Sequence, residues 1–367
     1  MVYVMKVLAI SSYGVLGGAE LSLAEFLVHR PTDVEAVVLL VEDGPLRARL
    51  MQQGVPTWTA SGYDGRPSPS QLAGFSRSLL KLLDVTAPDV VWATGLKAAY
   101  LAVPACRLAH VPLVWHKVDF SLDTVLTRPL AAAVNGVVSV SEAVAGAMGP
   151  LLRRRRLLAV VGPSVRLPRA LSIVPNAQEP TIGTMGTLTP IKGQRHLIEA
   201  AGILSTEFPQ LRLLLAGGSS PDHPGYPAEL RRLADRLGLG ERVELTGFIE
   251  DVTEILGRLT VFVNATYRDE RGFGWEGLSG AMLEASWAGL PVVATRGGGT
   301  PEGLSDGLTG TLVEPADPAG IARAVAPYLR DHALAVATGK AGRCFTREHF
   351  APDVGAERLF RALRKVV

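Results

Sequence analysis

The segment Glu276-Gly-Leu-Ser-Gly-Ala-Met-Leu-Glu284-Ala-Ser-Trp-Ala-Gly-Leu-Pro-Val-Val-Ala-Thr295 contains the two kinds of element that decide the fold class. Ser279 is a favourable N-cap residue, so we expect a helix over 279–288. The apolar run at 291–294 is continuous rather than alternating, which predicts a strand covered on both faces. A helix that leads directly into such a strand is typical of α/β proteins with a parallel sheet.

The same alternation continues along the whole chain in two series. The first series predicts strands at 6–10, 35–41, 90–93, 113–116 and 136–140, with helices at 19–28, 44–52, 70–83 and 141–148. The second series predicts strands at 181–185, 211–216, 242–246, 261–264 and 291–294, with helices at 193–204, 227–237, 252–259 and 279–288. We therefore predict two doubly wound, Rossmann-like domains that face each other across a cleft. Ligands of such sheets bind beyond the carboxyl ends of the strands.

The boundary between the two series is expected near 174–181, where the sequence is Val-Pro-Asn-Ala-Gln-Glu-Pro-Thr. This predicts a first domain over 1–178 and a second domain over 179–350. A final helix over 351–367 is expected to return to the first domain.

Composition excludes several classes of protein. Hydrophobic residues make up 47% of the 367 residues, which is too many for a disordered chain. The formal net charge of +2 gives no reason to expect nucleic acid as a partner. The two cysteines, Cys106 and Cys344, cannot build a disulfide framework, so a cytoplasmic location is expected. Residues 1–10 predict a strand rather than a signal peptide, because Lys6 interrupts the apolar run.

A run of four arginines, Arg153, Arg154, Arg155 and Arg156, lies between apolar residues at 151–152 and 157–161. Basic residues beside apolar ones suit an anionic lipid surface, which would place the protein at the inner membrane surface. The alternative is a solvated turn or loop whose arginines form ion pairs.

The two glutamates of the opening segment stand eight positions apart. With Ser279 as N-cap, Glu276 falls on the loop before the helix and Glu284 in its second turn. Between them, the N–H groups at 280–282 favour an anion such as a diphosphate. One carboxylate can then bind hydroxyls of a sugar and the other those of a ribose. The alternative is a surface loop and a helix with two ordinary glutamates.

Three other segments follow strands and precede helices. Gly186, Thr187 and Lys192 belong to one of them, in which the lysine can reach a phosphate as a mobile charge, or else is an ordinary surface lysine. At the second, Thr300 is expected as N-cap and Pro301 as the first helical residue. The third holds Gly14, Gly17 and Gly18; it indicates either a phosphate-binding turn or only a tight turn.

His116 ends a predicted strand, where side chains reach a ligand site. The alternative is a histidine that serves only the scaffold, which is common for a lone histidine.

Taken together, these motifs resemble the family-four retaining glycosyltransferases of the GT-B fold (glycosyl transferases group 1), from Gly17 to Asp317. The matching segments are Gly17-Gly-Ala-Glu20, His116 after Val-Trp, Val-Ser141-Glu-Ala-Val, Val174-Pro-Asn176, Gly186 to Gly193, Leu245-Thr-Gly-Phe248, Glu276 to Thr295, Gly298-Gly-Thr-Pro-Glu302 and Asp306-Gly-Leu-Thr-Gly-Thr-Leu-Val313. The pair of glutamates followed by Gly-Leu-Pro-Val-Val is the most specific of them.

The resemblance implies transfer of a sugar from a nucleotide diphosphate sugar to a hydroxyl acceptor, with retained configuration and without a metal or other cofactor. It implies catalytic roles for His116, Lys192 and Glu276. It implies donor binding by Gly17, Gly18, Gly186, Thr187, Lys192, Phe248, Ile249, Glu276, Gly277, Leu278, Ser279 and Glu284, and acceptor binding by Glu20. In this scheme the first domain binds the acceptor and the second binds the donor. Lys192 neutralises the diphosphate, Glu284 binds the ribose and Glu276 contacts the transferred sugar.

One departure from the family pattern keeps an alternative open. The family usually has an arginine where this chain has Thr187, and Arg195, Arg271 or Arg296 are the candidates to replace it. An inactive partner protein that binds sugar nucleotides is therefore the second hypothesis. A dinucleotide-dependent oxidoreductase with its cofactor at 14–18 is the third, and it leaves Lys192 and Glu276 unexplained. The nucleotide base, the sugar, the acceptor and the oligomeric state are left open.

Overall fold

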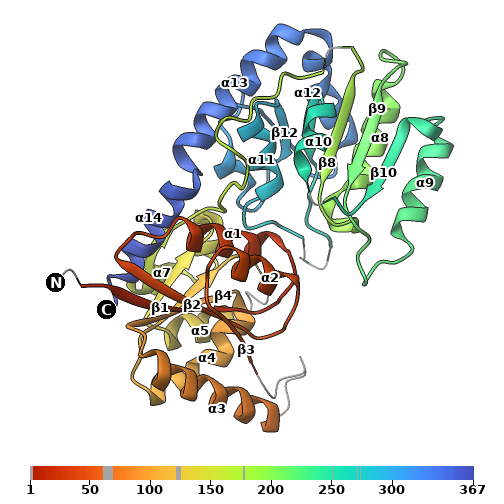
Figure 1. The fold of residues 1–367 in the computed structure, drawn as a ribbon. Helices are drawn as coiled ribbons and strands as arrows, with labels where there is room; N and C mark the ends of the chain where they lie inside the picture. The colour runs from red at the N-terminus through yellow and green to blue at the C-terminus, as the bar shows by residue number, and fades with distance from the viewer. Residues whose placement is uncertain are drawn as a thin grey trace. The chain divides into compact units, whose positions relative to one another are not determined.

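A computed structural model describes residues 3–60, 69–120, 125–176, 178–249, 251–270, 272 and 274–367. The chain divides into two compact units, of which unit 1 comprises Met1–Arg166 and Phe350–Val367, and unit 2 comprises Leu167–His349. Each unit has its own parallel sheet with helices on both faces, so the prediction of two Rossmann-like α/β domains is confirmed (Figure 1).

Unit 1 contains a seven-stranded parallel sheet in the described residues, in the order β3-β2-β1-β4-β5-β6-β7. Its strands are β1 (Met5–Ser11), β2 (Val34–Leu40), β3 (Thr57–Thr59), β4 (Val90–Thr94), β5 (Leu113–Lys117), β6 (Gly136–Ser139) and β7 (Leu157–Val160). Its helices are α1 (Gly18–Val28), α2 (Pro45–Gln52), α3 (Pro69–Thr86), α4 (Leu96–Leu108), α5 (Thr127–Ala133), α6 (Glu142–Gly146), α7 (Pro150–Arg156) and α14 (Pro352–Leu363). Figure 1 shows α1 and α2 on one face of the sheet and α3 and α4 on the other, and each face has its own apolar layer.

Unit 2 contains a six-stranded parallel sheet in the order β10-β9-β8-β11-β12-β13, again counted over the described residues. Its strands are β8 (Thr181–Met185), β9 (Arg212–Ala216), β10 (Val243–Gly247), β11 (Val261–Asn264), β12 (Val292–Thr295) and β13 (Thr311–Val313). Its helices are α8 (Gln194–Leu204), α9 (Tyr226–Arg236), α10 (Val252–Arg258), α11 (Gly280–Ala288), α12 (Pro318–Arg330) and α13 (His332–His349). Short 3-10 turns, η1 (Pro190–Lys192), η2 (Gly240–Arg242) and η3 (Thr300–Gly303), complete it.

The division between the units falls after Arg166, before the predicted residue 178. The segment that follows Arg166 is fastened to unit 2: the backbone N–H of Ile173 donates to Ala288 at 2.8 Å, and the indole N–H of Trp287 donates to Pro168 at 3.2 Å. Helix α14 contacts α1 and β7 of unit 1.

Several elements escaped the pattern analysis. β3 and β13 have three residues each, which is too short for a visible period. α4 is rich in alanine and contains Pro104, so it lacks a clear polar face and carries a residue that normally ends a helix. The arginine run, expected as a lipid-binding patch or a solvated turn, forms the short helix α7. No helix in the described residues combines the length and hydrophobicity needed to cross a bilayer.

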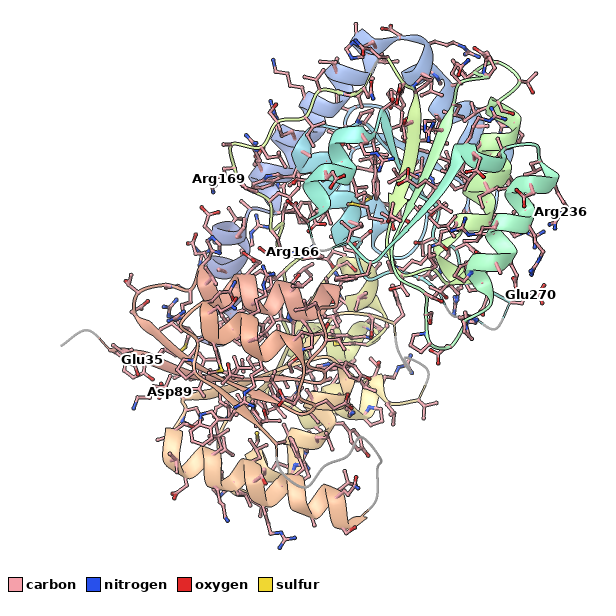
Figure 2. The ribbon with its side chains drawn as sticks, turned by 45° about the vertical axis from the view of Figure 1, so that its right-hand side comes forward. Glu35, Asp89, Arg166, Arg169, Arg236 and Glu270 are labelled. Atoms are coloured by element: carbon pink, nitrogen blue, oxygen red, sulfur yellow. The ribbon has the colours of Figure 1, made fainter. Side chains whose placement is uncertain are left out.

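The strand order fixes where a ligand can approach each sheet. In unit 1 the order reverses between β1 and β4, and in unit 2 between β8 and β11. At such a switch point the loops beyond the carboxyl ends of neighbouring strands leave in opposite directions and open a crevice. Glu35 and Asp89, labelled in Figure 2, lie at the other end of the unit 1 sheet, near the amino ends of β2 and β4. There Lys6 is the register partner of Glu35 in the neighbouring strand, and the backbone N–H of Lys6 donates to the carboxylate of Asp89 at 2.7 Å.

Candidate functional site

The switch point of unit 2 brings together side chains from three segments that are distant in sequence. Lys192 ends the turn η1 that follows β8, and Asn264 is the last residue of β11. Glu276 follows in the segment between β11 and α11, which also includes Glu270, labelled in Figure 2. The strand order thus explains why residues as far apart as 192 and 276 meet at one edge of the sheet.

Lys192, Glu276 and Asn264 form a continuous polar network. The ammonium of Lys192 donates to Oε1 of Glu276, and the amide nitrogen of Asn264 donates to Oε2 at 3.0 Å. The side chain of Glu276 is 14% exposed and that of Lys192 is 30% exposed, so the carboxylate is largely shielded from solvent and the lysine less so. A carboxylate with both oxygens engaged is held in one orientation, while the lysine is accessible to an incoming anion.

The two loops that carry this network are fastened to each other. The backbone N–H of Tyr267 donates to Ile191 at 3.0 Å. Gly193 adopts a left-handed conformation with φ of 69°, and a Cβ there would lie 2.0 Å from the carbonyl oxygen of Ala265. Only glycine allows this approach, so the position of Lys192 depends on the glycine that follows it.

The charge of Lys192 reflects two opposing influences. Burial lowers the pKa of Lys192 to about 8. The carboxylate of Glu276 in contact with it favours the charged form. Near neutral pH the lysine is therefore predominantly cationic and provides a positive charge for a phosphate.

Helix α11 begins as its sequence predicts. Ser279 is the N-cap, and its hydroxyl accepts from the N–H of Met282 at 3.4 Å. The N–H of Met282 was one of the three at 280–282 that were expected to be available to an anion. Because Ser279 accepts from it, this N–H is not available. Glu284 lies in α11 with 4% of its surface exposed. Gly277, Leu278 and Ser279, directly before the helix, are buried.

The turn after β8 contains Gly186 and Thr187. Gly186 packs against Gly217 beyond β9, where an added Cβ would lie 1.9 Å from the carbonyl oxygen of Gly186. Thr187 is exposed, and its carbonyl accepts from the buried amide nitrogen of Gln194 at 3.0 Å. The turn is therefore held by backbone contacts and by Gln194, a residue that the sequence analysis did not single out.

Two of the three arginines proposed to replace the family arginine have acidic partners. Arg195 donates to Glu199 at 3.0 Å, and Arg296 donates to Asp306 at 2.8 Å. Arg271 lies outside the described residues. Phe248 is 69% exposed beyond β10, which leaves its ring available for stacking, and Ile249 is half-buried.

The expectation for Thr300 is wrong in detail. Gly299, not Thr300, is the N-cap residue of η3, and no side chain caps it. The segment makes a four-residue 3-10 turn rather than the start of an α-helix. The adjoining glycines instead serve packing: a Cβ at Gly297 would lie 1.9 Å from the ring of Trp275, and the N–H of Gly299 donates to the carbonyl of Glu276 at 3.0 Å.

In unit 1, the predicted glycines and Glu20 lie at the start of α1. Gly17 is the N-cap, where a Cβ would lie 2.5 Å from Oε2 of Glu20, while a Cβ at Gly18 would meet no atom within 4 Å. Glu20 is 8% exposed, and its burial, together with the negative charge of Asp119, raises its pKa. Its own backbone N–H acts in the opposite direction.

His116 occupies β5 among aromatic side chains of unit 1. Its ring centroid lies 5.9 Å from that of Trp92 and 6.3 Å from that of Phe26. Among the described residues, neither ring nitrogen has a hydrogen-bond partner of good geometry. Burial lowers the pKa of His116 to about 4, against a smaller effect of the Val161 backbone, so the imidazole is neutral at pH 7.

The structure thus brings Lys192 and Glu276 into contact, and it adds Asn264, which the sequence analysis placed only at the end of a strand. A polar residue after the apolar run Val-Phe-Val at a strand's carboxyl end was the available signal. Gly17, Gly18, Glu20 and His116 belong to unit 1, and Gly186, Thr187, Phe248, Ile249 and Glu284 to unit 2.

Comparison with known proteins shows that part of the chain is similar to glycosyltransferases. Residues 179–331 match the family model described as glycosyl transferases group 1. A GDP-mannose-dependent alpha-(1-6)-phosphatidylinositol monomannoside mannosyltransferase of Mycolicibacterium smegmatis is 38% identical over 186 residues, which are 50% of this chain and 47% of the relative. A D-inositol 3-phosphate glycosyltransferase of Streptomyces avermitilis is 33% identical over 162 residues, or 42% of this chain and 33% of the relative. The matched part spans about half or less of the length of these curated relatives.

Solved structures resemble the chain over nearly its whole length. Anabaena HepE in complex with UDP and glucose has a TM-score of 0.84 at 23% identity, covering 98% of this chain and 99% of that one. Sucrose-phosphate synthase from Thermosynechococcus elongatus has a TM-score of 0.76 at 19% identity, covering 99% of both chains. We conclude that the chain has the GT-B fold and that its residues 179–331 are similar to the glycosyl transferases group 1 family.

Proposed function

We propose that the protein transfers a glycosyl group from a nucleotide diphosphate sugar to a hydroxyl acceptor, with retained configuration and without a metal ion. The contact between Lys192 and Glu276 at the switch point of unit 2 carries this proposal. It supports the proposal because a cation that can bind a diphosphate lies directly beside a carboxylate that can accept hydrogen bonds from sugar hydroxyls. Ligands named for the compared proteins agree with such a donor: GDP-mannose for the mycobacterial relative, and UDP with glucose for HepE.

In this mechanism the protein acts mainly through electrostatics. Negative charge grows on the leaving diphosphate as the glycosidic bond breaks, and Lys192 together with the start of α11 is arranged to stabilise it. Glu276 holds the sugar, and Glu284 accepts from the ribose hydroxyls. Gly186, Thr187 and 277–279 offer backbone groups to the donor.

The acceptor attacks from the same face, and its proton passes to the leaving phosphate. Phe248 and Ile249 contact the base in this proposal. The proposal also includes the roles that the family resemblance implies in unit 1. These are donor binding by Gly17 and Gly18, acceptor binding by Glu20 and a catalytic role for His116.

A screen of sugar nucleotides tests the proposal. GDP-mannose and UDP-glucose come first, followed by other GDP, UDP, dTDP and ADP sugars, with thermal shift as the measure of binding. Release of nucleoside diphosphate is then followed with and without EDTA, since slow hydrolysis needs no added acceptor. We expect one donor class to bind and to turn over in EDTA. Absence of binding to every donor, or loss of turnover in EDTA that Mg²⁺ restores, would contradict the proposal.

Thr187 supports a second candidate function, that of a sugar-nucleotide-binding protein without transferase activity. Its position has no guanidinium, and the described candidates Arg195 and Arg296 are engaged with acidic residues. Tight donor binding without transfer or hydrolysis would favour this function. Turnover of the bound donor would exclude it.

We also propose peripheral contact with anionic lipid through α7. Arg154 and Arg155 are exposed there, and Leu151 beside them is 62% exposed. Arg153 is paired with Glu142, and Arg156 donates to the carbonyl of Ala132 at 3.3 Å. The name of the mycobacterial relative contains phosphatidylinositol monomannoside, a derivative of an anionic phospholipid. Basic residues beside an exposed leucine fit such a surface.

A further inference from the structure

Asn264 places a polar side chain in a buried position at the centre of unit 2. It ends β11, whose preceding residues are the apolar Val-Phe-Val, and it is 5% exposed. A buried amide needs partners for both its carbonyl and its nitrogen, because an unsatisfied polar group destabilises the fold. Both partners are present, and each has a different consequence.

The backbone determines which way the amide points. Oδ1 of Asn264 accepts from the N–H of Thr266 at 3.1 Å. A backbone N–H can only donate, so the oxygen must face Thr266 and the nitrogen must face away from it. Thr266 is itself held, because the hydroxyl of Thr295 in β12 donates to its carbonyl. The amide nitrogen of Asn264 is therefore aimed by contacts from two neighbouring strands.

That nitrogen donates to Oε2 of Glu276 at 3.0 Å, and Oε1 accepts from Lys192. The main chain of Glu276 is anchored too, since the N–H of Gly299 donates to its carbonyl at 3.0 Å. One oxygen of the Glu276 carboxylate thus accepts from the neutral, fixed amide of Asn264, and the other accepts from the flexible ammonium of Lys192. Only the second of these contacts can be exchanged without moving the backbone.

We propose that Asn264 is a positioning residue that holds Glu276 in place when a donor diphosphate takes Lys192 away from it. The inference rests on the proposed function. Without a donor, Lys192 and Glu276 neutralise each other. When the diphosphate binds Lys192, Oε1 of Glu276 becomes available to a hydroxyl of the sugar. The amide of Asn264 then keeps the carboxylate oriented beside a diphosphate of like charge.

A reciprocal exchange of amide and carboxylate tests this role. Asn264→Asp preserves the oxygen that accepts from Thr266 but turns a second carboxylate toward Glu276. We expect donor turnover to fall about tenfold or more. In the Glu276→Gln background the hydrogen bond between the two side chains can form in the opposite direction, because the amide introduced at position 276 can donate to the carboxylate introduced at position 264. There the same change at position 264 is expected to cost less than about threefold relative to Glu276→Gln alone. Equal losses in the two backgrounds would show a merely structural role and overturn the proposal.

A second variant separates positioning from diphosphate binding and guards against misfolding. Asn264→Ser keeps a hydroxyl for Thr266 but cannot reach Glu276. Turnover should fall about tenfold, while the Kd of UDP or GDP, which lack the sugar, stays within about threefold of wild type. Unchanged turnover would contradict the positioning role. If the wild type binds neither the diphosphates nor the sugar nucleotides, or if Lys192→Ala binds them equally well, the proposed function itself fails.

Asn135→Asp is the matched control. Asn135 of unit 1 also accepts from a backbone N–H, that of Leu113 at 3.0 Å, and it is exposed. The same substitution there should leave turnover unchanged. A comparable loss of turnover would show that the effect at Asn264 is not specific to the site.

Discussion

The two switch points of the molecule have the same topology and different chemistry. In unit 1, between β1 and β4, the hydroxyl of Ser12 accepts from the N–H of Ala98 at 3.0 Å and donates to the carbonyl of Thr94 at 3.2 Å. Neutral groups satisfy one another there. In unit 2, between β8 and β11, an ammonium and a carboxylate meet instead. Parallel-sheet topology places both sites, but only the residues after the strands decide what each one can bind.

Unit 1 also has an ion pair near this edge, between Lys97 and Glu42. The carboxylate of Glu42 is 36% exposed against 14% for Glu276, so water screens it more strongly. The comparison predicts that a charge removed from unit 2 has a large functional effect, and that the corresponding change in unit 1 has a small one.

The largest effect is expected from Lys192→Ala. Loss of the cation that faces the leaving diphosphate should reduce turnover at least tenfold, and by about 10²–10³ where no other donor replaces it. Steady-state release of nucleoside diphosphate measures this change. Lys97→Ala is the control from unit 1 and should retain near-normal turnover. Equal effects of the two substitutions would remove the functional distinction between the switch points.

The next effect concerns His116 and the dependence of stability on pH. Its folded-state pKa of about 4 lies below its ordinary value of 6.5, so the unfolded chain binds more protons between these values. Its contribution is complete above pH 6.5 and is lost as the pH falls to 4. The loss is about 3 kcal/mol in free energy of unfolding. Urea unfolding at pH 7 and pH 4.5 measures most of this loss.

His116→Phe should reduce the pH-dependent part of this loss and retain the packing against Trp92. If the histidine serves catalysis as proposed, turnover of the folded variant falls at least tenfold. Full turnover in a stable variant would assign His116 to the scaffold of unit 1. An unchanged pH dependence would contradict the buried, neutral state of the ring.

Glu284→Ala tests the second carboxylate of unit 2. Loss of charged hydrogen bonds to a ribose should weaken nucleotide binding by about 1.5–3 kcal/mol, or roughly 10–100-fold in Kd. Turnover at saturating donor should change less than binding does. Isothermal titration with the nucleoside diphosphate measures the affinity, and Glu284→Gln tests whether the charge is required. Unchanged affinity would exclude the role at the ribose.

The smallest effect is expected on the surface of unit 1. Exchange of Arg154 and Arg155 for glutamate should reduce binding to vesicles that contain phosphatidylserine. Each lost arginine contributes about 1 kcal/mol, or roughly fivefold. Cosedimentation at low salt measures it, with phosphatidylcholine vesicles as the control. Equal binding by wild type and variant would exclude α7 as the contact.

The sequence predicted much of the fold because the continuous apolar strands are visible without tertiary contacts. Ser279 as the cap of α11 follows from local chemistry in the same way. By contrast, α4 and β3 lack a readable pattern, since one is apolar with an internal proline and the other has three residues. For Thr300, local rules predicted an N-cap. In the structure Gly297 packs on Trp275, and Gly299 is the N-cap of the 3-10 turn η3.

Residue chemistry and spacing marked Lys192, Glu276 and Glu284 as candidates beside glycine turns and helix starts, with ordinary surface residues as the alternative, and the family resemblance supplied their roles. Only the tertiary structure decided that Lys192 contacts Glu276, that Asn264 holds the other carboxylate oxygen, and that His116 lies among aromatic rings. The physical reason is strand order. Neighbours in a sheet are not neighbours in sequence, so β8 and β11 bring together groups that no local pattern relates.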